Sequence, residues 1–144
     1  MNDIDTLART LWGEARNQGY AGMQAVANVV MNRLAVSKQH PGYWWGGTVS
    51  NICMHKFQFS CWNVNDPNKD KLAAVNDKDR QFSQALAIAC KAVAGQLPDI
   101  TGGATSYHTI SCHPEWDQNL LPTVRIGAHQ FYRDEDNIPP VKEA

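Results

Sequence analysis

The stretch Leu11-Trp12-Gly13-Glu14-Ala15-Arg16-Asn17-Gln18-Gly19 places an ionisable side chain within an apolar helical pattern. Apolar residues recur at the helix period from the N-terminus onward, and Glu14 follows Leu11 by three positions, so it shares the apolar face. Asp3 is the expected N-cap of this helix, and Gly19 is its expected end. A buried carboxyl without partners costs several kcal/mol, so the chain must either pair Glu14 or use it.

Two interpretations of Glu14 follow from this position. In the first, Glu14 is a structural carboxylate at the edge of the buried face, paired with a cation such as Arg16 or Arg33. In the second, it is a catalytic acid, because an apolar setting raises the pKa of a carboxyl and keeps it protonated near neutral pH. The helical period alone does not separate the two.

The bulk composition is that of one globular domain. The chain has 144 residues, 43% of them hydrophobic and 19% charged, so we expect a single domain over 1–144 with a loose tail at 135–144. The net charge of −1 leaves no basic stripe for nucleic acid.

No membrane or export signal is expected in the sequence as it stands. The longest apolar run, Met23–Met31, contains Gln24 and Asn28 and is too short to span a bilayer, so no stable membrane insertion is expected. The first residues are acidic and polar, unlike a signal peptide. We therefore expect a cytoplasmic protein that reaches any external target only after release by another factor.

The remaining pattern predicts a mainly helical α+β domain with a small β-element. Helical periodicity recurs in two more long segments, Ala21–Leu34 and Arg80–Ala94, and Thr48 is the expected cap of a short helix. Alternating residues predict extended structure in three segments, and a polar stretch predicts a loop. The extended segments are Lys56–Asn63, Gly102–His108 and Val124–Arg133, and the loop is Asn65–Asp79.

Several smaller features bear mainly on packing. Asn32 is expected to hydrogen-bond a loop from the second helix. The aromatic loop, Tyr43-Trp44-Trp45, either fills the core or offers stacking faces for sugars, and core filling is the favoured interpretation. The four cysteines form no CxxC pair, so buried free thiols are expected, with Cys90 among alanines in the core.

Glu14 fits the acid of an enzyme that cuts a glycan. Such an acid donates its proton to the glycosidic oxygen, and an ordinary hydrolase adds a second carboxyl. No second carboxyl stands out among the candidates, which favours one carboxyl that acts first as acid and then as base. The candidates are Asp66, Asp70, Asp77, Glu115 and Asp117.

Two other chemistries stay open. A metal site could draw on six His and Cys residues, although their spacing matches no familiar zinc pattern. These are His55, Cys61, His108, Cys112, His113 and His129. A nucleophilic pair, Cys61 or Cys112 with His108 or His129, would suit an amidase or peptidase that acts on the stem peptides of a cell wall.

Four regions, in order, resemble the spore cortex-lytic (SleB-type) cell-wall hydrolase family. They cover the chain from about residue 5 to 133. They are Leu7-Ala8-Arg9-Thr10-Leu11-Trp12-Gly13-Glu14-Ala15-Arg16, Ala25-Val26-Ala27-Asn28-Val29-Val30-Met31-Asn32-Arg33, Gln58-Phe59-Ser60-Cys61-Trp62, and Gly103-Ala104-Thr105-Ser106-Tyr107-His108 with Ile126-Gly127-Ala128-His129-Gln130-Phe131-Tyr132.

The resemblance implies a lysozyme-like α+β fold and a peptidoglycan-degrading activity. The family cleaves glycan strands between N-acetylmuramic acid and N-acetylglucosamine, generally as lytic transglycosylases that leave a 1,6-anhydro muramic end. Its catalytic glutamate, in a Glu-Ala-Arg motif, falls on Glu14. Its groove-lining segments imply substrate binding by Gln58, Ser60, Thr105 and Tyr107. No cofactor or metal is implied, the expected partner is the glycan strand, and we expect a monomer.

Some positions depart from the family pattern. Gln18 stands where the family often has a second acidic residue, which leaves Glu14 as the lone carboxyl of the motif. The aromatic loop and the pair Cys112-His113 match no family feature. The expected absence of both an export signal and wall-binding modules resembles a phage endolysin, which waits in the host cytoplasm and passes through a separate membrane pore at host lysis. A bacterial housekeeping or prophage-derived wall enzyme is the alternative.

Overall fold

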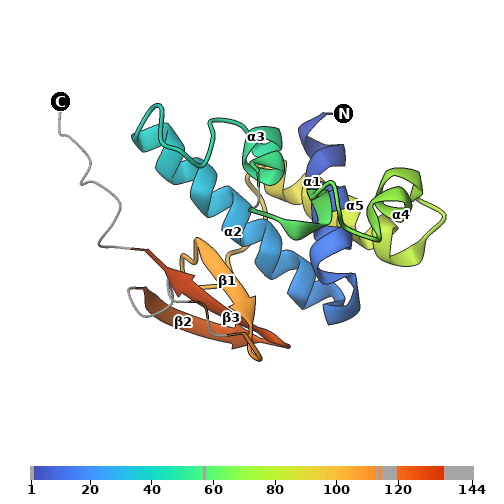
Figure 1. Ribbon diagram of the computed structural model, residues 1–144. Helices are drawn as coiled ribbons and strands as arrows, with labels where there is room; N and C mark the ends of the chain where they lie inside the picture. The colour runs from blue at the N-terminus through green and yellow to red at the C-terminus, as the bar shows by residue number, and fades with distance from the viewer. Residues whose placement is uncertain (1, 57, 113, 115–119, 135–144) are drawn as a thin grey trace.

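A computed structural model describes residues 2–56, 58–112, 114 and 120–134 of the chain. Helices come first and a small sheet follows (Figure 1). The helical elements are α1 (Asp3–Ala15), η1 (Arg16–Gln18), α2 (Gly19–Gln39), α3 (Val49–Met54), η2 (Ser60–Trp62), α4 (Lys69–Ala74) and α5 (Arg80–Val93), of which η1 and η2 are 3-10 turns. The strands are β1 (Ser106–Thr109), β2 (Leu121–Ile126) and β3 (His129–Arg133). The predicted mainly helical α+β class is confirmed, and the predicted tail at 135–144 lies outside the described residues.

The N-cap of the first helix, α1, lies one residue before the expected cap. The side chain of Asn2, not Asp3, accepts the first free backbone N–H, from Asp5 at 2.8 Å. Asp3 instead accepts hydrogen bonds from the backbone and hydroxyl of Ser50 at the start of α3. The predicted apolar face is confirmed, with Leu7, Leu11 and three further apolar residues, Ala8, Trp12 and Ala15, fully buried or nearly so against the other helices.

The long helix α2 separates the helical core from the sheet (Figure 1). It extends beyond the predicted range at both ends, and its apolar surface has two sides. Met23 and Val26 pack into the core formed with α1, α3 and α5. Ala25 and Val29 pack instead against Phe131 of the sheet. A helix that is apolar on two sides is placed between two layers.

Two asparagines of α2 fix the chain that leads into the sheet. Asn28 donates to the carbonyl of Pro98 at 3.0 Å and accepts from the backbone of Ile100 at 3.0 Å. Asn32 donates to Asp99 at 3.1 Å and to the carbonyl of Ala104 at 2.9 Å. The predicted loop bonding by Asn32 is therefore confirmed.

The sheet is antiparallel in the order β1-β3-β2. Tyr107 pairs with Phe131, and Ile126 pairs with His129. The segment predicted as one extended run, Val124–Arg133, is in fact two strands joined by a tight turn at Gly127, whose φ of +57° favours glycine. The alternation continued through the turn, so the sequence pattern did not reveal it.

Three other sequence predictions are wrong. The segment around Ser60 is not a strand but the 3-10 turn η2, in which the backbone N–H of Trp62 donates to the carbonyl of Phe59 at 3.1 Å. The predicted loop contains α4, which a single apolar side chain, Leu72, anchors in the core. Cys90 is exposed on α5, because the buried face of that helix is formed by Phe82, Ala85, Ile88, Ala89 and Ala92.

Candidate active site

The site forms where the end of α1 meets η2 and β1. Gly13 allows this approach, since a Cβ at that position would lie 2.6 Å from the Cβ of Cys61. The next residue along α1 is Glu14, and the residue before Cys61 is Ser60. The close packing of Gly13 against the Cys61 side chain therefore brings the carboxyl of α1 beside the hydroxyl of η2.

The carboxyl of Glu14 is half-buried and accepts hydrogen bonds from two hydroxyls. Tyr107 of β1 donates to Oε1 at 3.0 Å, and Ser60 donates to Oε2 at 3.3 Å. The tyrosine ring is held in place by the ring of His129 at 4.9 Å between centroids and by the ring of Phe131 at 5.4 Å. One carboxyl oxygen thus has a donor from the sheet and the other a donor from the helical layer.

Burial raises the pKa of Glu14 above its ordinary value of 4.5. Hydrogen bonds from Tyr107, the Cys61 backbone and Ser60 oppose this rise, while the negative charge of Asp66 adds to it. A carboxyl with a raised pKa keeps its proton to higher pH, and its hydroxyl partners stabilise the carboxylate once the proton has left. Glu14 is thus equipped both to give and to take a proton.

The ion-pair interpretation of Glu14 is wrong. Arg16 donates to the carbonyl of Trp12 at 3.1 Å, and its guanidinium lies 4.0 Å from the centroid of that indole ring. Arg33 donates to the carbonyl of Thr105 at 2.6 Å and to Gln58 at 3.3 Å. Within the described part of the chain, neither arginine forms an ion pair with Glu14.

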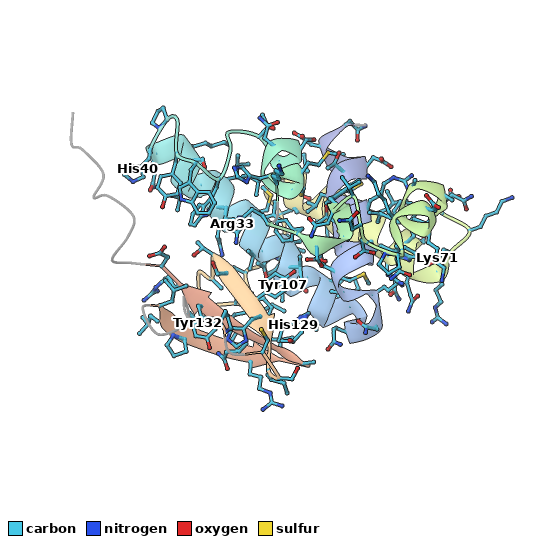
Figure 2. The ribbon with its side chains drawn as sticks, in the orientation of Figure 1. Arg33, His40, Lys71, Tyr107, His129 and Tyr132 are labelled. Carbon is cyan, nitrogen blue, oxygen red and sulfur yellow. The ribbon has the colours of Figure 1, made fainter. Side chains whose placement is uncertain are left out.

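The four predicted binding residues separate into two groups. Ser60 and Tyr107 contact Glu14 directly. Gln58 and Thr105 contact Arg33 instead, and Thr105 is buried. Figure 2 labels Arg33 and Tyr107 near the boundary between α2 and the sheet.

Arg33 was considered from the sequence only as a partner for Glu14. The signal for a larger role was present, because Arg33 follows Val30 by three positions and Val26 by seven. The helical period that places Glu14 on the buried face of α1 also places Arg33 on a buried face of α2.

Of the possible second carboxyls, Asp66 is the one described residue whose charge acts on Glu14. Asp70 and Asp77 are exposed, the first on α4 and the second after it. Glu115 and Asp117 lie outside the described residues. Gln18, at the position where a second acid was expected, accepts a hydrogen bond from the backbone of Ala128 at 3.0 Å and so joins η1 to the β2–β3 turn.

The metal and thiol alternatives gain no support from the geometry. Among the residues that the structure describes, no three or more His, Cys, Asp or Glu side chains are grouped so that they could hold a metal ion. His108 stacks on Tyr132, with Nε2 at 2.9 Å from its hydroxyl. Burial, together with the charge of Glu14, raises the pKa of the Cys61 thiol, which disfavours the thiolate that a nucleophile needs. His113 lies outside the described residues.

The two tryptophans of the aromatic loop differ in exposure. Trp45 is buried at 3% exposure, whereas Trp44 is 53% exposed. Their rings lie 5.8 Å apart, and Trp44 also contacts the ring of His55 at 5.6 Å. The core-filling interpretation holds for Trp45 but not for Trp44.

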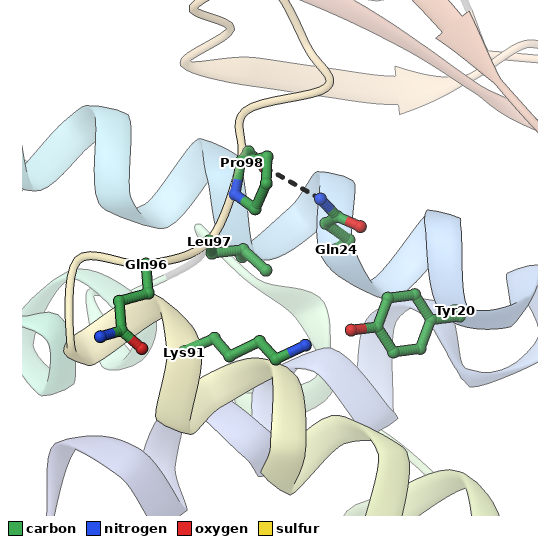
Figure 3. A pocket seen from close by; sticks show the side chains of 6 residues that line it. All are labelled: Tyr20, Gln24, Lys91, Gln96, Leu97 and Pro98. Atoms are coloured by element: carbon green, nitrogen blue, oxygen red, sulfur yellow. Dashed lines mark hydrogen bonds between the residues drawn. The ribbon is translucent and has the colours of Figure 1, made fainter.

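A separate hollow of about 410 Å³ lies between α2, α5 and the segment that follows α5 (Figure 3). Gln24 spans part of it by donating to the carbonyl of Pro98 at 2.9 Å. Its lining residues are Tyr20, Gln24, Lys91, Gln96, Leu97 and Pro98. None of them is a hydrogen-bond partner of Glu14, so the hollow is distinct from the candidate site.

Comparisons with known proteins agree with the fold. The family model described as Cell Wall Hydrolase matches residues 17–132, a region that begins just after Glu14. The catalytic domain of the germination-specific lytic transglycosylase SleB from Bacillus anthracis is 26% identical, with a TM-score of 0.67, over 92% of this chain and 95% of that one. The catalytic domain of the Bacillus cereus SleB protein is 25% identical, with a TM-score of 0.67, over 91% and 89%.

A comparison with curated proteins finds no match to the chain. In the described residues, no helix is both long enough and apolar enough to cross a membrane. The two SleB catalytic domains share the mainly helical, lysozyme-like fold with this chain along most of its length.

Proposed function

The chain belongs to the Cell Wall Hydrolase family, and we propose that it degrades bacterial peptidoglycan by cleaving the glycan strand between N-acetylmuramic acid and N-acetylglucosamine. The proposed reaction is that of a lytic transglycosylase. The similarity to a SleB catalytic domain that is named as a lytic transglycosylase supports this reaction type.

The observation that carries the proposal is the environment of Glu14. Its carboxyl is half-buried, has a raised pKa, and is held by one hydroxyl on each oxygen. A general acid for a glycosidic oxygen needs a raised pKa and a fixed orientation, and this carboxyl has both.

In the proposed mechanism, Glu14 acts twice. As an acid it gives its proton to the glycosidic oxygen while the bond to the anomeric carbon of the muramic acid breaks. As a base it then takes the proton of the sugar's own C6 hydroxyl, whose oxygen attacks the anomeric carbon and closes the 1,6-anhydro ring. Tyr107 and Ser60 stabilise the carboxylate between the two steps.

Hydrolysis is the second candidate, and the charge of Asp66 favours it. A second carboxylate that acts on the acid is typical of glycosidases in which water is the acceptor. In that reaction Asp66 would activate the water, and the new end would be reducing. An amidase or peptidase remains a weaker alternative, because Cys61 is disfavoured as a thiolate.

Glu14→Gln tests the proposal. The amide keeps the shape of the side chain but has no proton to transfer, so we expect wall clearing to fall to background. Asp70→Asn is the matched control, since it neutralises an exposed carboxylate on α4 and should leave activity unchanged. Full activity of Glu14→Gln would refute the assignment.

The products distinguish the three reactions. Mass spectrometry of digested peptidoglycan should show 1,6-anhydro ends for a transglycosylase, reducing ends for a hydrolase, and freed stem peptides for an amidase. Loss of activity in Asp66→Asn, with reducing ends from the parent enzyme, would replace the transglycosylase proposal by the hydrolase.

We also propose that the enzyme works as a monomer, without a cofactor, and that its setting is lysis of a host cell from the cytoplasm. Expression in a bacterium with and without a separate pore-forming protein tests the setting. Lysis only when the pore is present supports release from the cytoplasm, whereas lysis without the pore contradicts it.

A further inference from the structure

Arg33 is a buried cation with no carboxylate partner in the described part of the chain. Its side chain lies on α2 and the residue is 7% exposed. Nε donates to the carbonyl of Thr105 at 2.6 Å, and Nη1 donates to Oε1 of Gln58 at 3.3 Å. The guanidinium lies 5.2 Å from the ring centroid of Trp45 and 5.5 Å from that of Phe59. A buried charge that is held only by neutral groups is costly, so its position calls for a function.

The two hydrogen-bond partners of Arg33 have related positions in the chain. Thr105 lies two residues before Tyr107, and Gln58 lies two residues before Ser60. Tyr107 and Ser60 are the two hydroxyls that donate to Glu14. One guanidinium thus joins the two segments that supply both donors to the candidate acid.

We infer that Arg33 is a positioning residue that holds the 58–60 segment and the start of β1 at the spacing at which Ser60 and Tyr107 both reach Glu14. The inference rests on the proposed role of Glu14. Arg33 itself touches neither Glu14 nor, in the proposed mechanism, the substrate.

The chemistry of the arginine side chain suits this role. A guanidinium is planar and directs several N–H groups at fixed angles, so it can hold two acceptors on different segments at once. Its flat face also packs on aromatic rings. Lysine keeps the charge but has neither the fixed fork nor the flat face, so it cannot hold both segments.

A neighbouring hydrogen bond of α2 adds to the ties made by Arg33. Asn32, the preceding residue of α2, holds the carbonyl of Ala104, which precedes Thr105. Arg33 therefore extends a series of bonds from one long helix to the connection that enters β1. The hydrogen bond from Arg33 to Gln58 joins α2 to the 58–60 segment, which supplies the second hydroxyl donor to Glu14.

The pKa of Glu14 depends on whether Ser60 and Tyr107 are both close enough to donate to its carboxyl, so a titration of Glu14 tests their positions. The groups that act on Glu14 are Tyr107 on β1, Ser60 and the Cys61 backbone on η2, and Asp66 in the following loop. Cys53 on α3 also feels the charge of Glu14. Hydroxyl donors lower the pKa of Glu14, so their displacement raises it while burial persists.

The experiment compares Arg33→Lys with the parent protein by ¹³C NMR titration of the Glu14 carboxyl, assigned with the aid of Glu14→Gln. We expect the titration midpoint to rise by about one pH unit, the effect of losing one donor to a carboxylate. The charge at position 33 is retained, so a changed midpoint reports displaced donors and not a lost cation.

Arg9→Lys is the matched control. Arg9 also holds backbone carbonyls, those of Leu72 at 2.7 Å and Val75 at 2.9 Å, and its guanidinium lies 5.1 Å from the ring centroid of Phe82. Arg9 therefore joins α1 to α4 and to the residue that ends α4. These contacts lie away from the two segments that supply the hydroxyl donors to Glu14. We expect Arg9→Lys to lower thermal stability without moving the Glu14 midpoint. An unchanged midpoint in Arg33→Lys, or an equal rise in Arg9→Lys, would overturn the inference.

If Arg33→Lys does not fold, Gln58→Leu decides the question. It removes one of the two ties and leaves the arginine in place, so the midpoint should still rise, by less than one pH unit. An unchanged midpoint in that variant overturns the inference. The titration needs no enzymatic activity, so it separates failure of the positioning role from failure of the proposed function. In an active enzyme, Arg33→Lys should also move the alkaline limb of kcat to higher pH.

Discussion

Tyr107→Phe isolates the bond between the sheet and the candidate acid. The substitution removes the hydroxyl that donates to Oε1 of Glu14 at 3.0 Å. The ring stays against His129 and Phe131, so packing is retained. Hydrogen bonds to charged groups contribute about 1.5–3 kcal/mol, and Ser60 remains as a donor on the other oxygen. For a half-buried carboxyl we expect the lower value, about 1.5 kcal/mol, when Glu14 is ionised.

The expected loss of stability depends on pH, and its sign follows from the raised pKa of Glu14. The folded protein holds the Glu14 proton more tightly than the unfolded chain, whose ordinary value is 4.5. The contribution of Glu14 to the free energy of unfolding is therefore most favourable below 4.5 and falls as pH rises through the folded pKa. Loss of the Tyr107 hydroxyl raises that pKa further, so the variant should be destabilised by about 1.5 kcal/mol near pH 8 and by much less near pH 4.

Urea unfolding at the two pH values measures this difference. The set is the parent, Tyr107→Phe, Glu14→Gln and the double variant, which together form a double-mutant cycle. The pKa of Tyr107 is raised well above 10, so the tyrosine itself stays neutral throughout. Equal destabilisation at both pH values, or a coupling energy near zero in the cycle, would refute the claim that this hydroxyl stabilises the carboxylate.

Three further predictions test the packing around the site. Gly13→Ala should lower the free energy of unfolding, measured in urea, by about 2 kcal/mol, because the added Cβ meets the Cβ of Cys61. This cost outweighs the higher helix propensity of alanine. A stabilised variant would contradict the close approach of Gly13 and Cys61. Iodoacetamide with mass spectrometry should label exposed Cys90 in the native protein but not buried Cys61, and the reverse order would contradict the assigned burial. Trp45→Ala should cost about 3–5 kcal/mol of unfolding free energy, whereas Trp44→Ala should change it by about 0.5 kcal/mol or less, because Trp44 is half exposed.

Helical periodicity predicted the parts of the fold in which one face of a long element is buried. It placed Leu7 and Leu11 in the core, and it placed Glu14 beside that core at the end of α1. It also predicted α5, whose expected N-terminus at Arg80 is confirmed. These elements are amphipathic over three or more turns, so their local pattern carries enough information to define them.

Elements that depend on one distant contact were missed. α4 is six residues long and Leu72 is its buried residue, and the short run Leu72-Ala73-Ala74-Val75 in a polar stretch shows no helical period. The alternation around Phe59 comes from burial against α1 and not from a strand. A period of two says which side chains point inward but not whether a neighbouring strand is present.

The site shows the same limit at the level of single residues. The period placed Glu14 on a buried face, and Arg33 was considered only as one of its possible ion-pair partners. The structure separates them, because each is satisfied by other segments: Glu14 by residues 46 and 93 positions away, and Arg33 by residues 25 and 72 positions away. Since the chain places a pair of neutral donors, and not a cation, on the carboxyl, the carboxyl retains a raised pKa that a buried ion pair would have lowered. The segments that keep the arginine away from the acid are therefore also those that leave the acid able to hold its proton.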